Sequence, residues 1–377
     1  MKFRVERDAL ADAVTWAARS LASRPTLPVL AGLLLRVDDD QLTVSGFDLE
    51  ASTEVELQVM AGESGQALVS GRLLADITRA LPPHPVDVSV DGTRLSIVCG
   101  SARFSLPGMP VDDYPKLPAM PTTAGTVDGA EFAAAVAQVA IAAGRDDTLP
   151  MLTGVRLEID GEKLTLAATD RYRLAVRELT WHPDDPSAAN AQVLVPARAL
   201  ADSAKSLSHS ETMTISLSAG GTGEGIIGFS GATNGRASRA TTRLLDATFP
   251  AYRSLLPNEW ASSAELAVAP LVEAVKRVAL VTDRNAPVRM EFGDGSVALT
   301  AGGDDEGRAE EQLEVAYDGE GITTAFNPQF LLDGLGALST GTARMLFTSS
   351  TKPVVLKPES ADGTEYTYLI MPVRLPG

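Results

Sequence analysis

The residues that could carry acid, base or metal chemistry are few in this chain. Cys99 is the only cysteine, and the three histidines, His84, His182 and His209, lie far apart in Pro- or Ser-rich stretches. A single cysteine excludes an internal disulfide and a thiolate metal cluster. The sequence contains no His-Glu-x-x-His or other metal-ligand spacing. Cys99 lies in the alternating run LSIVCGSARF, so we predict that its thiol is buried and structural. We also predict that the protein binds no metal or cofactor.

One glycine-rich stretch has the spacing of a nucleotide-binding motif. GEGIIG, residues 223–228, matches Gly-x-Gly-x-x-Gly, but strand-like runs stand on both sides of it. A dinucleotide site needs a helix after the glycines, so we interpret the stretch as a hairpin loop. No Ser/His/Asp or paired-carboxylate arrangement is recognisable, although such sites assemble in space. We favour a non-catalytic protein, and an enzyme stays as an alternative for a turnover assay.

The C-terminal stretch YTYLIMPVRLPG, residues 366–377, indicates a different chemistry. Chain termini are usually polar, whereas this one is an apolar strand-like run that ends in Met-Pro-Val-Arg-Leu-Pro. Aliphatic walls, an adaptable methionine, rigid prolines and an arginine at the rim suit recognition of a peptide. A plain core strand is the alternative, but it leaves Pro372, Val373 and Arg374 unexplained.

These residues belong to a unit that occurs three times. LPVLAGLLLRVDDDQLTVSGFD (27–48) matches LPMLTGVRLEIDGEKLTLAATD (149–170), and APVRMEFGDGSVALTAG (286–302) is a third, diverged copy. Each copy has the pattern of two alternating strands around a turn, with Asp160-Gly161 and Asp294-Gly295 as hairpin signals. A further hairpin is clearest at 86–106, where Asp91-Gly92 predicts a type I′ turn.

Helical patterns accompany each hairpin. Apolar residues at three- and four-residue spacing predict a helix before the hairpin at 7–21, 129–143 and 269–281, and another after it at 69–81, 195–207 and 325–338. Each repeat closes with a large residue before Pro and then Leu-Pro. We therefore predict an α+β protein of three tandem similar domains, 1–120, 121–252 and 253–377, each with two helices packed on antiparallel sheets.

The composition fits a globular protein outside the membrane. The chain is 45% hydrophobic and 21% charged, so each domain can bury a core. No apolar run approaches the roughly 18 residues of a membrane span, and MKFRVERDAL does not resemble a signal peptide. We expect a cytoplasmic protein. The net charge of −17 argues against nucleic-acid binding by the whole surface, but not by a local face.

Five stretches are specific when taken together: RPTLPVLAGLLL (24–35), ATDRYRLAV (168–176), FPAYRSLLP (249–257), AFNPQFLLDGLGAL (325–338) and MPVRL (371–375). They resemble the sliding clamp of bacterial replication, the β subunit of DNA polymerase III, over the whole chain. The resemblance implies a closed ring of two head-to-tail chains, with helices inside and sheets outside. Twelve inner helices spaced about 8–10 Å apart leave a hole of roughly 20–27 Å, which admits duplex DNA.

The resemblance also implies a function and partners. The ring would be a non-catalytic processivity factor that slides on double-stranded DNA without sequence specificity and tethers the replicative polymerase. Its partners would be the DNA polymerase III α subunit, the clamp loader and other proteins with a clamp-binding motif, such as translesion polymerases, ligase and mismatch repair proteins. A protein-binding scaffold unrelated to DNA remains the alternative, which retention on circular DNA would decide.

A peptide-binding groove between the second and third domains follows from the resemblance. Its residues in this sequence would be Leu152, Thr169, Arg171, Tyr172, Arg173, Leu174, Pro250, Ser254, Leu255, Pro353, Leu369, Met371, Pro372, Val373 and Arg374. The chain departs from the enterobacterial pattern at two places in the groove. Arg171-Tyr172 replaces Gly-His and Ser254 replaces an arginine, so the motif preference does not transfer in detail.

Two further sets of residues are expected from the same reasoning. The segments expected to form inner helices carry as many cations as acids, against −17 overall, and the best candidates for transient phosphate contacts are Arg24, Arg72, Arg145, Arg198 and Arg277. For the dimer interface we expect strand pairing between the first domain of one chain and the third of the next, with Arg103, Phe104, Leu106, Leu280, Glu306 and Glu310.

Overall fold

The computed structural model describes residues 1–22, 24–184, 190–218, 225–233, 235–281, 286–302, 307–359 and 366–374. Its contacts divide the chain into two compact units, which are described separately. Unit 1 comprises Met1–Ala133, Asp160–Glu162 and Trp181–Asp246. Unit 2 comprises Ala134–Ile159, Lys163–Thr180 and Ala247–Gly377.

One order of elements occurs three times: a strand, a helix, five strands, a helix and three strands. The first repeat has β1 (Lys2–Val5), α1 (Arg7–Ala17), β2 (Gly32–Asp38), β3 (Gln41–Phe47), β4 (Ala51–Gln58), β5 (Met60–Glu63), β6 (Gly65–Ser70), α2 (Gly71–Ala80), β7 (Val86–Asp91), β8 (Arg94–Cys99) and β9 (Ala102–Met109).

The second and third repeats follow the same order. The second has β10 (Thr122–Asp128), α3 (Gly129–Ala140), β11 (Gly154–Asp160), β12 (Lys163–Thr169), β13 (Arg173–Thr180), β14 (His182–Pro183), β15 (Asn190–Pro196), α4 (Ala197–Leu207), β16 (Thr212–Leu217), β17 (Ile226–Thr233) and β18 (Arg236–Arg243). The third has β19 (Ser262–Ala267), α5 (Val268–Val278), β20 (Val288–Gly293), β21 (Ser296–Ala301), β22 (Ala309–Glu314), β23 (Ala316–Asp318), β24 (Ile322–Phe326), α6 (Pro328–Gly336), β25 (Thr342–Phe347), β26 (Val354–Pro358) and β27 (Tyr366–Ile370). The six predicted helices and the α+β class are confirmed.

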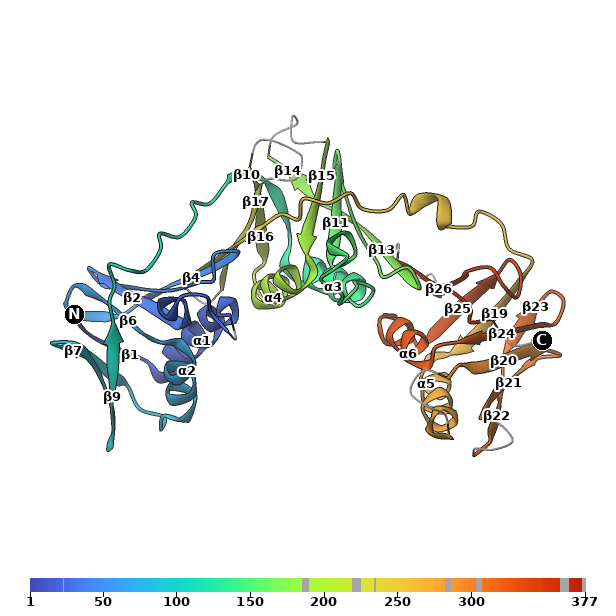
Figure 1. Cartoon of the computed structure of the whole chain (residues 1–377), viewed down its shortest axis with the longest axis horizontal. Coiled ribbons are helices and arrows are strands. Elements are labelled where there is room, and N and C mark those ends of the chain that lie inside the picture. Colours follow the sequence, from blue (N-terminus) through green and yellow to red (C-terminus); the bar gives the residue numbers. More distant parts are fainter. Residues whose placement is uncertain are drawn as a thin grey trace. The chain divides into compact units, whose positions relative to one another are not determined.

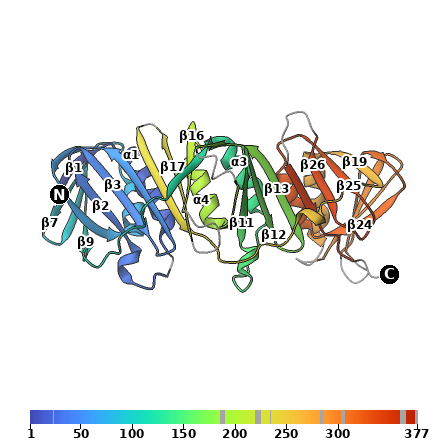
Figure 2. The same cartoon turned by 90° about the horizontal axis from the view of Figure 1, so that it is seen from above.

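In each unit, helices pack in pairs against antiparallel strands (Figure 1). α1 packs on α2 in unit 1, and α5 packs on α6 in unit 2. The helices bury their apolar faces, such as Leu10 and Val14 of α1 and Leu74 of α2, against strand residues such as Phe3 and Val44. This burial of apolar surface supplies the main favourable term for folding. From above, the strands of each unit lie side by side, for example β25 beside β26 (Figure 2).

Antiparallel sheets continue from one repeat into the next. In unit 1, β4 of the first repeat pairs with β18 of the second, with Ala51 opposite Thr242. In unit 2, β13 of the second repeat pairs with β27 of the third, with Arg173 opposite Ile370. Each junction therefore joins the third strand after the first helix to the last strand of the following repeat. This pairing satisfies backbone groups that an open sheet edge would leave exposed.

The predicted hairpins are confirmed, but one turn type is wrong. Asp91 pairs with Arg94, which makes Gly92 and Thr93 the two loop residues. Gly92 has φ +58° and Thr93 is not among the residues with positive φ, so the loop has the pattern of a type II′ turn. At Asp294 and Gly295 both φ angles are positive, 45° and 74°, as a type I′ turn requires.

The predictions for Cys99 and for GEGIIG are confirmed where the structure describes them. Cys99 is fully buried, with its Sγ 3.2 Å from the His84 carbonyl oxygen. β17 begins at Ile226 and pairs with β16, so a strand and not a helix follows the glycines, while residues 223 and 224 lie outside the described part. Within the described residues, no helix is long and apolar enough to cross a membrane, and no cluster of metal-ligating side chains occurs.

Candidate peptide-binding site

A tight turn from Asp170 to Arg173 forms the centre of the site. The Asp170 Oδ1 accepts the backbone N–H of Tyr172 at 3.0 Å and of Arg173 at 3.1 Å. The Thr169 hydroxyl donates to the Arg173 carbonyl at 2.6 Å and accepts the N–H of Arg171 at 3.2 Å. These bonds hold Arg171 at φ +79°, a conformation that costs a residue with a Cβ atom about 1–2 kcal/mol. The turn directs Arg171 and Tyr172 outward, and both side chains are exposed.

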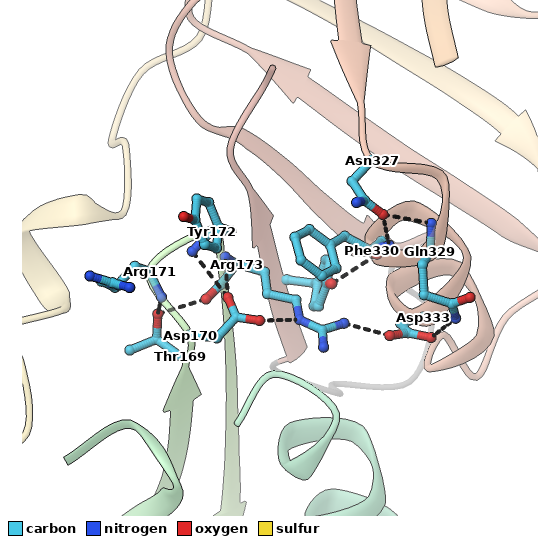
Figure 3. A network of polar contacts seen from close by, with 10 residues as sticks. Thr169, Asp170, Arg171, Tyr172, Arg173, Asn327, Gln329, Phe330 and Asp333 are labelled. Atoms are coloured by element: carbon cyan, nitrogen blue, oxygen red, sulfur yellow. Dashed lines mark hydrogen bonds and ion pairs between the residues drawn. The ribbon is translucent and has the colours of Figure 1, made fainter. Parts of the chain in front are cut away.

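Arg173 joins the second repeat to the third (Figure 3). It is 6% exposed, and its guanidinium donates to Asp170 Oδ2 at 2.9 Å and to Asp333 Oδ2 at 2.5 Å. The guanidinium carbon lies 4.5 Å from the centre of the Phe330 ring. Burial lowers the pKa of the Arg173 guanidinium, but the neighbouring Tyr368, Asp333 and Asp170 raise it by more. The pKa of Arg173 therefore lies above its ordinary value. The buried charge is therefore paired on two sides and stacked on a ring.

α6 presents its half of this network at its N-terminus. Asn327 caps the helix by accepting the N–H of Gln329 at 2.9 Å and of Phe330 at 3.3 Å. Gln329 in turn donates to Asp333 Oδ1 at 2.6 Å. Gln329 of the same helix thus orients the Asp333 carboxylate, which also pairs with Arg173.

The linker between the second and third repeats is anchored beside the turn. Glu158 of β11 is 8% exposed and accepts the Tyr252 hydroxyl at 3.3 Å and the guanidinium of Arg253. Phe249 packs edge-on against Tyr252 with ring centres 5.9 Å apart. Leu255 follows these anchors and leaves 49% of its surface exposed. The anchored linker therefore presents an apolar side chain to solvent.

The tail, residues 371–374 after β27, lies beside the turn at 170–173. The backbone N–H of Met371 donates to the Tyr172 carbonyl at 2.8 Å, and the N–H of Val373 donates to Ala325 at 2.8 Å. Met371 and Val373 each remain 37% exposed, and Tyr172 remains 56% exposed. Together with Leu255, these side chains are large apolar groups that unit 2 leaves accessible.

The predicted groove residues separate by burial. Leu152, Thr169, Arg173, Leu174 and Leu369 are buried, Pro250, Pro353 and Pro372 are half-buried, and Arg171, Tyr172, Ser254, Leu255, Met371, Val373 and Arg374 are exposed. Beside them, a cavity of about 640 Å³ extends between Arg145, Tyr172, Phe330 and Asp333. Sequence reasoning missed Asp170, Gln329, Phe330 and Asp333. The Asp shared by positions 48 and 170 of the repeats was one available signal.

The five candidate DNA-contacting arginines, Arg24, Arg72, Arg145, Arg198 and Arg277, are all exposed. Two of them already have acidic partners. Arg277 donates to Glu311 at 3.0 and 2.5 Å, and this hydrogen bond lowers the pKa of Glu311. Arg198 lies 3.9 Å from Asp202 one turn away. Arg24 and Arg198 lie on one cavity of unit 1.

The expected interface residues differ in their accessibility. Arg103, Phe104, Leu280 and Glu310 are exposed, with Phe104 at 38% and Leu280 at 82%. Leu106 does not point outward, because its side chain is 2% exposed and belongs to the core of the first repeat. Leu106 lies on the same face of β9 as Phe104, but the core of the first repeat covers only Leu106. Glu306 lies outside the described residues.

Comparison with known proteins places the chain in a family. Residues 1–118, 126–251 and 253–374 match the N-terminal, central and C-terminal domains of the DNA polymerase III beta subunit. The chain is 55% identical over 381 residues to the beta sliding clamp of Streptomyces coelicolor, with 100% of both chains covered. It is 46% identical over 378 residues to a beta sliding clamp homolog of Streptomyces muensis, with 99% of both covered.

A solved structure agrees with these matches. The sliding clamp of Pseudomonas aeruginosa, determined bound to griselimycin, superimposes with a TM-score of 0.89 at 28% identity, with 100% of both chains covered. The threefold order of elements is therefore that of three tandem clamp domains. The chain belongs to the DNA polymerase III beta subunit family, the beta sliding clamps.

Proposed function

We propose that this protein is the processivity clamp of chromosomal replication. Two chains would form a ring around duplex DNA and hold the replicative polymerase close to its template. The full-length relationship to beta sliding clamps carries this proposal. A tethered polymerase rebinds as an intramolecular event, because the ring keeps its effective concentration high. The protein would act without catalysis or a cofactor, in the cytoplasm.

The strand order supports ring closure by two chains. β4 pairs with β18 and β13 pairs with β27, so the third strand after each first helix joins the last strand of the next repeat. By the same rule, β22 would pair with β9 of the partner chain. In the described part, β22 pairs only with β21, and β9 reaches β6 only through Gly108 and Met109. Arg103 and Phe104 on one side and Glu310 and Leu280 on the other would then meet.

The domain boundaries at 120 and 252 are part of this proposal. The first falls between β9 and β10, and the second falls between β18 and β19. Contacts alone divide the chain differently, since paired strands make each junction between repeats dense.

The groove in unit 2 would bind the partners. Its accessible apolar side chains and the arginine rim fit a short peptide, and we propose that the DNA polymerase III α subunit, the clamp loader and the repair proteins with a clamp-binding motif use it in turn. Griselimycin, which the Pseudomonas aeruginosa clamp binds, would compete for the same place. Arg24, Arg72, Arg145 and Arg198 would contact the phosphates transiently, while Arg277 would do so less because Glu311 holds it.

The proposed function can be tested by comparing retention of the protein on circular and on linear DNA. After loading by a clamp loader onto nicked circular duplex DNA, the protein should remain bound through gel filtration. It should dissociate when a restriction enzyme linearises the circle, because enclosure and not adhesion retains it. Equal retention on circular and linear DNA would contradict a sliding ring.

A further inference from the structure

Unit 1 contains a cavity between the first helix of the first repeat and the second helix of the second repeat. The cavity has a volume of about 300 Å³, at the lower end of the range of small-ligand sites. Its walls come from α1 and the turn after it, from the end of α4, and from the hairpin that joins β17 to β18. The five candidate DNA-contacting arginines, all of which the structure describes, lie outside its lining.

The ionisable side chains that line this cavity are mostly cationic. Arg19, Lys205 and Arg236 line it with a single carboxylate, that of Asp12, and His209 lines it as well. With His209 counted as neutral, three cations against one acid give the described lining a net charge of +2, whereas the whole chain carries −17. A concave site lined by one sign of charge concentrates ions of the opposite sign. The lining therefore favours an anion.

Two of these cations have no acidic partner in the described part of the chain. Arg19 donates to the Ser206 hydroxyl and, at 3.4 Å, to the Asp202 carbonyl oxygen, and both acceptors are neutral. The Asp202 carboxylate pairs with Arg198 instead. Lys205 is exposed in the last turn of α4. Both charges are therefore free to meet a ligand.

The third cation is held by the one acid. Arg236 donates to Asp12 Oδ2 at 3.1 Å, and the side chains of Arg236 and Asp12 are 25% and 66% exposed. An ion pair with so exposed a carboxylate contributes little to stability, because water competes for the charge. An anion in the cavity can therefore share Arg236 with Asp12 or displace it, and Asp12 is its competitor within the chain.

The fold itself does not require the two unpaired cations. α3 begins 122 positions after α1, and α6 begins 131 positions after α4. Ile141 therefore takes the place of Arg19, and Gly336 takes that of Lys205. The corresponding helices form and pack with uncharged residues at these positions, so a structural need does not explain the cations.

We propose that this cavity binds a phosphate group through Arg19, Lys205 and Arg236. Guanidinium and ammonium groups are the usual partners of phosphate oxygens. A carboxylate offers two oxygens and one negative charge, whereas a phosphate monoester offers three free oxygens and a charge of about −1.5 to −2 at pH 7, which matches the lining better. The phosphate belongs either to the backbone of the enclosed DNA, a source that rests on the function proposed above, or to a free phosphate. The experiment separates the two.

The test follows the indole N–H resonances of the full-length clamp labelled on tryptophan. Trp16 lines the cavity, and its buried indole N–H has no hydrogen-bond partner among the described residues, so its resonance should respond to a nearby ligand. Trp181 and Trp260 do not line the cavity and serve as references.

Inorganic phosphate is the probe, with the ionic strength held constant by chloride. It should shift the Trp16 resonance saturably, with a midpoint in the millimolar range, and acetate should bind at least about tenfold more weakly. Equal affinity for acetate would overturn the proposal, and so would a shift that does not saturate or that chloride alone produces.

Charge variants locate the site. Arg19→Gln and Lys205→Gln should each weaken phosphate binding about tenfold, because each removes a cation. Asp12→Asn should strengthen it about threefold, because it removes the competing carboxylate. Arg289→Gln, at an exposed arginine of β20 outside the cavity, removes the same charge and should leave the midpoint unchanged.

Unchanged affinity in Lys205→Gln and Arg19→Gln, or weaker binding in Asp12→Asn, would refute the site. If Arg19→Gln does not fold, Lys205→Gln decides, because its side chain is exposed.

A short blunt DNA duplex distinguishes the two sources of phosphate. If the duplex shifts the Trp16 resonance and competes with inorganic phosphate, the site takes a backbone phosphate. If the duplex leaves the resonance in place while inorganic phosphate shifts it, the site takes a free phosphate. A clamp that is retained on circular DNA but shows no response at Trp16 would refute this site alone, and a clamp that binds phosphate without being retained would refute only the proposed function.

Discussion

At the scale of single residues, backbone conformation and residue type disagree at Arg171. Its φ of +79° lies in the region that glycine favours, and the enterobacterial pattern has glycine there. Leu49, the corresponding residue of the first repeat, has the same φ of +79°. The Asp before each of them fixes the turn by accepting two backbone N–H groups. The hydrogen bonds of each turn therefore compensate for the steric cost of the left-handed conformation.

Replacement of Arg171 by glycine should stabilise the protein. Removing the strain of the left-handed conformation should raise the free energy of unfolding by about 1–2 kcal/mol. The greater freedom of glycine in the unfolded chain should lower it by about 0.5–1 kcal/mol. We expect a net rise of up to about 1.5 kcal/mol in the free energy of unfolding, measured by chemical denaturation.

Matched variants in the first repeat provide the control. Leu49→Gly should also stabilise, whereas Glu50→Gly, at an ordinary φ, should destabilise by about 0.5–1 kcal/mol. A loss of stability in Arg171→Gly would mean that its side chain contributes more than its strain costs.

Tyr252 gives a prediction at alkaline pH. Burial, with the nearby Glu158 carboxylate, raises the pKa of Tyr252 to about 12 from its ordinary 10. The unfolded chain therefore loses this proton first as the pH rises. Tyr252 contributes stability in full below pH 10, and this contribution is lost between pH 10 and 12. Tyr252→Phe should show a smaller fall in stability across this window in thermal melts, and an unchanged fall would contradict the assignment.

The composition of the tail, together with the family resemblance, predicted the residues of the proposed groove. Met371, Val373 and Leu255 have the accessibility that a peptide wall needs. Arg173 was expected as a groove residue, and it is also the buried link between the second and third repeats. Its partner Asp333 is 160 positions away in the sequence, and no local sequence pattern indicates that the two residues pair. Contacts between distant segments depend on the register of β13 and β27, which only the fold determines.

At the scale of elements, the tail after β27 is held by few bonds. Met371 donates to Tyr172 and Val373 donates to Ala325, and both side chains stay accessible. A similar bond ends the second repeat, where the N–H of Leu245 donates to the Leu194 carbonyl at 2.8 Å. The tail is thus the ordinary end of a repeat, and we propose that it forms one wall of the peptide-binding groove.

Deletion of residues 371–377 should abolish binding of polymerase-derived peptides and leave the dimer intact. The deletion removes four of the proposed groove residues, 371–374, and two backbone hydrogen bonds, but no residue of β9 or β22. Fluorescence anisotropy of a labelled peptide measures affinity, and light scattering measures mass. Truncation of 375–377 alone is the control and should retain binding. Unchanged affinity in the longer deletion would refute the groove.

At the scale of the whole molecule, the proposed ring depends on two strand edges. Phe104 on β9 leaves 38% of its surface exposed, and Leu280 near α5 leaves 82%. Exposed apolar residues beside a strand edge without a partner favour association with another chain. The wild-type chain should have the mass of a dimer, about 79 kDa or twice 39.5 kDa.

Phe104→Asp should shift the protein toward monomers, because it places a carboxylate in an interface that already contains Glu310. Sedimentation at decreasing concentration should show dissociation at a concentration at least about tenfold higher than for the wild type. Met60→Asp, at an exposed residue of β5, should leave the dimer unchanged. An intact dimer in Phe104→Asp would place the interface elsewhere.

The sequence by itself determined the three repeats, their helices and hairpins, and the apolar tail, because these depend on local periodicity and on turn residues at short spacing. The tertiary structure alone decided which repeat positions face each other across a junction. It showed that Arg173 of the second repeat meets Phe330 and Asp333 of the third at the junction in unit 2. The reason is physical: packing between distant segments follows from strand register, and a single sequence does not record that register.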